Sequence, residues 1–86
     1  MKYVYNTNGR VCAQFVEVEV ENDCVKSVNF IGGCDGNHKG IAALAAGMQV
    51  KEAIRRLAGI TCGMRNTSCP DQLACALKQY LQENNQ

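Results

Sequence analysis

The chain has 86 residues, of which 47% are hydrophobic, and its nine basic and eight acidic residues give a net charge of +1. This length predicts one domain, residues 1–86, whose core is near the lower size limit for independent folding. The charges are spread along the chain without a basic stripe or an aromatic ladder, which argues against a nucleic-acid partner.

Three strands are predicted, over residues 2–7, 10–21 and 25–32. Asn8-Gly9 is typical of a tight hairpin turn between the first two strands. In the second strand, the alternation from Val16 to Glu21 places valines on the inner face and glutamates on the outer face. A three-residue loop at 22–24 is then expected to lead into the third strand.

Matching the inner faces of the second and third strands predicts their register, with Val18 opposite Val28 and Val16 opposite Phe30. The same ladder, continued, places Cys12 opposite Cys34 at one end of the sheet. Phe15 breaks the alternation, and a bulge there would shift Cys12 by one position and still leave it beside Cys34. Cys24 is expected at the other end, roughly 30 Å away along the strand.

Three helices are predicted after the sheet, over residues 38–48, 49–58 and 70–81. Each carries an apolar stripe, and the stripe of the third contains Leu73, Ala76, Leu77, Tyr80 and Leu81. Gly59 followed by Ile60 predicts a left-handed cap at the end of the second helix. The pattern predicts an α+β fold, in which a three-stranded antiparallel meander is followed by helices packed on one face.

Six cysteines are a high number for this length. No apolar run is long enough for a signal peptide or a membrane span, so we expect a cytoplasmic protein with no membrane partner. In a reducing compartment, such a cysteine content indicates metal or redox chemistry before disulfides. Disulfides, or cysteines that serve only as small buried hydrophobic residues, are the structural alternatives.

Four cysteines are expected at one end of the molecule, namely Cys12, Cys34, Cys62 and Cys69. The first two pair across the sheet, Cys62 follows the second helix, and Cys69 opens the third. Cys24 is excluded by distance. Cys75 points about 160° away from the buried stripe of its helix, so it is either exposed or part of a self-association contact, which leaves a homodimer as an alternative.

Helix starts favour the thiolate form of a cysteine, because unpaired amide groups and the helix dipole stabilise negative charge there. Cys34 and Cys69 both lie at predicted helix starts, and thiolate is the form that binds metal. His38 and Asp35 are candidate additional ligands. The structural alternative for His38 is a solvated helix start, and for Asp35 and Asp71 it is an interaction with the helix dipole.

The segment "TSCPD" at 67–71 resembles the signature of the TSCPD domain family. The resemblance covers residues 3–82 and includes "IGGCDGNHKGI", "GITCG" and "TSCPDQLA", so the family's four-cysteine pattern falls on Cys12, Cys34, Cys62 and Cys69. TSCPD domains also occur at the C-terminal end of adenosylcobalamin-dependent ribonucleotide reductases, and some small members carry the label ribonucleoside-diphosphate reductase. The chain is too short to contain the reductase's catalytic barrel, so the resemblance implies an accessory or metal-bearing module.

A more distant similarity is to iron–sulfur scaffold proteins of the IscU/NifU type, whose three cysteines match Cys12, Cys34 and Cys69 in order. This chain has Gln14 where the scaffold family has Asp, and Ser68 where it has His. In place of those ligands it offers a fourth cysteine, Cys62. The similarity therefore implies an IscU/NifU-like fold with a more permanent metal site.

We expect a module that binds Zn²⁺ or an iron–sulfur cluster through Cys12, Cys34, Cys62 and Cys69. The resemblance implies a ribonucleotide reductase or an iron–sulfur assembly protein as the partner. One alternative is a thiol redox partner of a ribonucleoside-diphosphate reductase, in which Cys12 and Cys34 form a reversible disulfide. Another is a plain interaction domain. Whether the chain is an enzyme stays open at this point.

Overall fold

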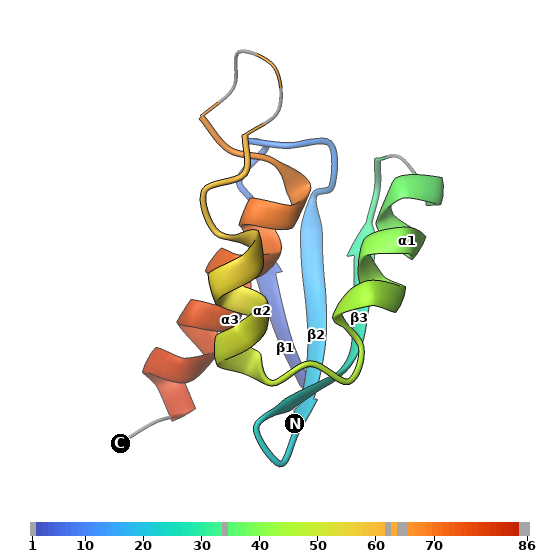
Figure 1. Ribbon diagram of the computed structural model, residues 1–86. Coiled ribbons are helices and arrows are strands. Elements are labelled where there is room, and N and C mark those ends of the chain that lie inside the picture. Colours follow the sequence, from blue (N-terminus) through green and yellow to red (C-terminus); the bar gives the residue numbers. More distant parts are fainter. Residues whose placement is uncertain (1, 34, 62, 64–65, 85–86) are drawn as a thin grey trace.

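The computed structural model describes residues 2–33, 35–61, 63 and 66–84 (Figure 1). Its elements are β1 Lys2–Asn6, β2 Phe15–Glu21, β3 Cys24–Ile31, α1 Asp35–Ala45, α2 Val50–Leu57 and α3 Cys69–Asn84. The strands form one antiparallel sheet in the order β1-β2-β3. This arrangement confirms the predicted α+β class and the meander topology.

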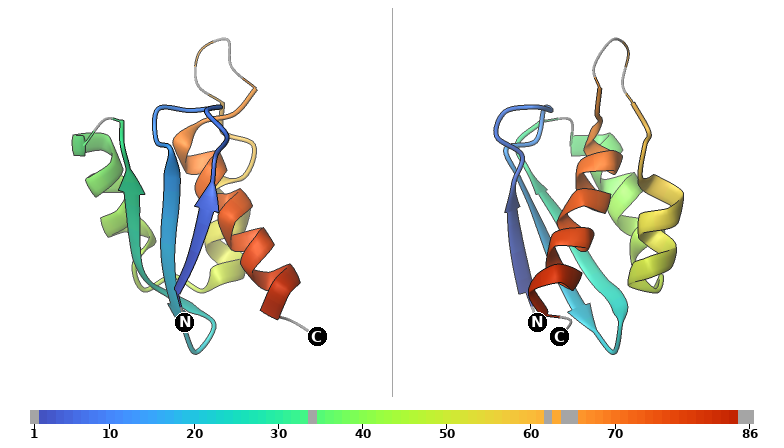
Figure 2. Two further views of the ribbon diagram at one scale, coloured as in Figure 1. Left: turned by 180° about the vertical axis from the view of Figure 1, so that it is seen from behind. Right: turned by 90° about the vertical axis from the view of Figure 1, so that its left-hand side faces the viewer.

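The three helices cover one face of the sheet. α1 packs along β3, while α2 packs on α3, which lies against β1 and β2 (Figure 2). The second and third helices nearly match their predicted ranges, and α3 extends three residues further than expected. Among the described residues, no helix combines the length and the apolar composition needed to cross a membrane.

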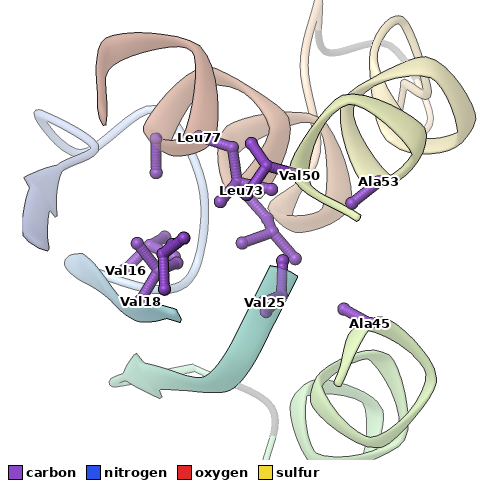
Figure 3. Packing of buried hydrophobic residues seen from close by; sticks show 10 residues of the cluster. Val16, Val18, Val25, Ala45, Val50, Ala53, Leu73 and Leu77 are labelled. Atoms are coloured by element: carbon purple, nitrogen blue, oxygen red, sulfur yellow. The ribbon is translucent and has the colours of Figure 1, made fainter. Parts of the chain in front are cut away.

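The core lies between β2 and the helices. Val16, Val18 and Val20 are buried, whereas the glutamates between them are at least partly exposed, as the alternation predicts. Leu73 and Leu77 of α3 close over these valines from above the sheet (Figure 3). Alanines at Ala45, Ala53 and Ala76 complete the core, and their small size allows the helices to approach closely.

The predicted register between β2 and β3 is confirmed, with Val18 opposite Val28 and Val16 opposite Phe30. The predicted three-residue loop is wrong, because Cys24 pairs with Glu21 and only Asn22 and Asp23 form the turn. Both turn residues have positive φ, 54° and 64°, as a two-residue hairpin turn of type I′ requires. A bulge beside Glu19 and Val20 offsets the shorter turn, so the inner faces still match.

The connection between β1 and β2 is longer than predicted. Asn8 and Gly9 do have positive φ, but β2 begins at Phe15, five residues later than the predicted start of the second strand. The buried hydroxyl of Thr7 donates to the carbonyls of Ala13 at 2.7 Å and Gln14 at 3.1 Å. These bonds, which a local sequence pattern does not show, hold residues 8–13 as a loop.

The first helix begins and ends three residues earlier than predicted. Gly47 has a φ of 92° after α1, and its N–H donates to the carbonyl of Val25 at 2.7 Å. The N–H of Val25 in turn donates to the carbonyl of Met48 at 2.7 Å. Pairing with the start of β3 therefore removes Met48 from the helix, although its side chain still packs against the core.

Leu77→Ala tests the packing of α3 on the sheet. Leu77 is fully buried among the core valines, so we expect a loss of about 2–5 kcal/mol in the free energy of unfolding. Leu44→Ala in α1 is the matched control, because Leu44 is 75% exposed and should change stability by no more than about 0.5 kcal/mol. Urea unfolding at equal metal content measures both, and similar effects for the two leucines would contradict this packing.

Candidate metal centre

Cys12 lies in the loop between β1 and β2. Its neighbours Val11 and Ala13 are buried, and Cys12 itself is exposed. The hydrogen bonds of Thr7 to the loop's C-terminal carbonyls hold this arrangement. The loop therefore anchors itself through two small apolar side chains and presents the thiol between them to solvent.

Cys69 is the first residue of α3 and is buried. It packs with Val11 and Ala13 in a small apolar cluster, and Phe30 of β3 packs against the same cluster. The structure thus brings the residues flanking Cys12 into contact with Cys69, although the two cysteines are 57 positions apart in the chain. Cys12 and Cys69 therefore lie at the same end of the sheet, while their role as ligands stays a prediction.

The predictions for the other four cysteines compare differently with the structure. Cys34 and Cys62 lie outside the described residues, so their place in the predicted site stays a prediction. Cys24 begins β3 at the opposite end of the sheet, beside the turn of the second hairpin (Figure 1). Cys75 is half-buried on α3. Within the part of the chain that is described, no three His, Cys, Asp or Glu side chains form a ready metal-binding group.

The residues around Cys69 fix the start of α3. Ser68 caps the helix, because its Oγ accepts from the N–H of Asp71 at 3.2 Å and donates to the carbonyl of Ile60 at 2.6 Å. Asp71 accepts from the N–H of Gly59 at 2.7 Å and from the hydroxyl of Thr67. The sequence alternative for Asp71 was an interaction with the helix dipole alone. The structure shows that its carboxylate also accepts these two hydrogen bonds. Ser68 and Asp71 tie the first turn of α3 to the chain that follows α2.

Gln72 is a buried polar residue behind this turn that sequence analysis did not identify. Its Nε2 donates to the hydroxyl of Thr67 at 2.8 Å, and its Oε1 has no hydrogen-bond partner among the described residues. The sequence could have indicated that Gln72 lies near the site, because it follows Cys69 by three residues and residues i and i+3 share a helix face. Its amide supports Thr67 and through it the helix start.

His38 is buried, with 6% of its surface exposed, so the expectation of a solvated helix start is wrong. Its ring stacks on Phe30 with 4.4 Å between centroids. Gly33, just before Cys34 in the chain, has a φ of 85° and leaves the space that this packing needs. A Cβ on Gly33 would be 2.7 Å from Cε1 of His38 and 2.8 Å from Cβ of Cys12.

A cluster of charged side chains lies on the exposed face of α2. Glu52 accepts hydrogen bonds from Arg55 and Arg56, and the bond from Arg55 is the main reason that the pKa of Glu52 is lowered. Both arginines are exposed, so this arginine pair lies on a solvated helix face. The candidate centre is instead built from thiols, apolar side chains and a buried imidazole.

The TSCPD domain family model matches residues 2–81, nearly the whole chain. No curated protein and no solved structure matches the chain. The matched range contains the cap of α3, the loop that carries Cys12 and the buried His38.

Ser68→Ala tests the link between α2 and α3. The variant loses the helix cap and leaves the carbonyl of Ile60 without its hydroxyl donor, so we expect a loss of about 1–2 kcal/mol in stability. Ser27→Ala, at an exposed strand position, is the control and should change stability by no more than about 0.5 kcal/mol. Thermal and urea unfolding of both variants measure the difference. Equal stabilities would show that the cap is not formed in solution.

Gly33→Ala tests the close approach of Cys12 and His38. The added methyl group would overlap both side chains on a backbone with positive φ, so we expect a loss of about 1–3 kcal/mol. Gly40→Ala in α1 is the matched control, because nothing lies within 4 Å of the new methyl group. That variant should gain up to about 1 kcal/mol from helix propensity. A Gly33→Ala protein as stable as the Gly40→Ala protein would disprove the contact.

Proposed function

The chain belongs to the TSCPD domain family, and on that premise we propose that it is a metal-binding module whose ligands are Cys12, Cys34, Cys62 and Cys69. The observation that carries this proposal is the packing of Val11 and Ala13, on either side of Cys12, against Cys69 at the start of α3. Two thiols distant in the sequence share one end of the fold. Zn²⁺ or an iron–sulfur cluster is the group that such a set of thiolates would hold.

The described residues fit a thiolate-bound metal. Cys12 is exposed on an anchored loop, and Cys69 opens a helix whose first turn is fixed by Ser68 and Asp71. Amide groups at a helix start stabilise negative charge on a ligand. Two oxygen donors of this turn, the hydroxyl of Ser68 and the carboxylate of Asp71, are already engaged in hydrogen bonds.

The role that follows is primarily structural. A metal held by these four cysteines would link the loop before β2, the start of α1, the segment after α2 and the start of α3. In a chain of this size, that link would contribute a large share of the folding free energy. The module would then support a partner in ribonucleotide reduction or in iron–sulfur and metal handling, which is the role that the family resemblance implies.

The exposure of Cys12 favours one second candidate, a thiol redox partner. In that role Cys12 and Cys34 would together give two electrons and two protons to a disulfide of a reductase, and would themselves become a disulfide. The two candidates differ in what the reduced protein contains. A metal module holds a stoichiometric ion when reduced, whereas a dithiol donor does not need one.

Elemental analysis with a visible absorption spectrum, on protein purified without oxygen or chelator, tests the proposal. We expect one metal centre per chain, colourless with zinc or brown with iron and sulfide. Cys12→Ser and Cys69→Ser should each lose the metal and destabilise the fold, while the controls Cys24→Ser and Cys75→Ser should retain it. Reduced wild-type protein that folds without metal would refute the metal module and leave the redox candidate.

A further inference from the structure

Gln72 is a buried amide whose hydrogen bond to Thr67 is the first of a series. The side chain of Gln72 is 1% exposed, and its Nε2 donates to the hydroxyl of Thr67 at 2.8 Å. The hydroxyl of Thr67 donates to Oδ2 of Asp71, and Oδ1 of the same carboxylate accepts from the N–H of Gly59 at 2.7 Å. These hydrogen bonds form a relay, the Gln72 relay, from the buried face of α3 to the chain that follows α2.

The relay fixes the orientation of the Gln72 amide. A carboxylate only accepts hydrogen bonds, so the hydroxyl of Thr67 must give its single proton to the bond with Asp71. Thr67 can then only accept from Gln72, which requires Nε2 to face it. Oε1 is left buried without a partner among the described residues, which is unfavourable. Gln72 therefore acts through its N–H donor, because an inverted amide would place two acceptor oxygens against each other.

The relay connects the two chain segments that carry Cys62 and Cys69. Cys62 follows the last residue of the relay by three positions and lies outside the described residues, and Cys69 is the first residue of α3. Ser68 adds a second connection, because its Oγ donates to the carbonyl of Ile60 at 2.6 Å. Side chains of the α3 start thus hold both segments together. Such preorganisation reduces the conformational entropy that is lost when two ligands share one metal.

We infer that Gln72 is a positioning residue of the cysteine site, whose amide N–H starts the relay that holds the chain before Cys62 against the first turn of α3. The inference rests on the proposed function for its consequence, which is a higher metal affinity of a preorganised ligand pair. Groups that orient metal ligands from outside commonly contribute about 10- to 100-fold to metal affinity. Gln72 itself is not a ligand in this arrangement.

Nuclear magnetic resonance measures both ends of the relay, with or without metal. Gly59 is exposed, so slow exchange of its N–H with water reports the bond to Asp71. Thr67→Val retains the shape of the side chain but interrupts the relay, and we expect Gly59 to lose this protection and the side-chain amide signals of Gln72 to shift. Thr67→Ser is the matched control, because it keeps the hydroxyl and should stay close to the wild type in both signals.

Cadmium affinity gives the second readout. Gln72→Met removes the donor together with the unpaired Oε1 and retains an unbranched buried side chain, and we expect its cadmium affinity to fall by about tenfold or more. Gln82→Met, at an exposed position of α3, is the matched control and should bind cadmium as the wild type does.

A double variant separates the relay from simple packing. Combining Gln72→Met with Thr67→Val should reduce cadmium affinity little more than Gln72→Met alone, because both changes interrupt the same series of hydrogen bonds. Additive losses would show that Gln72 acts independently of Thr67 and would overturn the inference.

The failure of this inference is distinguishable from the failure of the proposed function. If Thr67→Val leaves the Gln72 amide signals unchanged, or if a folded Gln72→Met holds cadmium as tightly as the wild type, the inference is overturned while the metal module stands. If Gln72→Met does not fold, Thr67→Val against Thr67→Ser replaces it in the cadmium measurement, with the same expected loss. If the wild type binds no metal, the proposed function fails, and the resonance comparison of the two Thr67 variants still decides whether the relay forms.

Discussion

The inner face of β2 is the constraint on which the structure depends. Val16, Val18 and Val20 of this central strand are buried, and the helices cover the face of the sheet on which they lie. Leu73 and Leu77 of α3 provide that cover. Since hydrophobic burial is the main favourable contribution to folding, the position of α3 on the sheet follows from these contacts.

The candidate centre is a consequence of the same packing. Once Leu73 is seated on the valines, the first turn of α3 reaches the end of the sheet, where Cys69 meets the anchored loop of Cys12. The hydrogen bonds of Ser68 and Asp71 then fix the chain after α2 to that turn. The residues that carry the proposed function are thus held by elements whose stability comes from the core.

Local periodicity in the sequence was sufficient to predict the regular strands and helices. It was insufficient to predict structure that depends on contacts between residues distant in the sequence. The alternation in β2 predicts the correct register, and a shorter turn and a bulge compensate each other within it. The late start of β2 depends on the buried hydroxyl of Thr7, and the burial of His38 depends on stacking with Phe30 from another element. A polar neighbourhood in the sequence, such as that of His38, does not report contacts of this kind.

The residues that join α2 to α3 and the thiol of Cys69 lie in one short segment of the sequence, but the hydrogen bonds of the junction do not depend on the thiol. Thr67, Ser68 and Asp71 form a hydrogen-bonded joint between two helices, and none of these bonds uses the thiol of Cys69. The hydrogen bonds of the joint therefore do not require a thiol at the first helical position. A match to this short signature in another protein would then report a helix junction, and its chemistry would have to be established from the thiols around it.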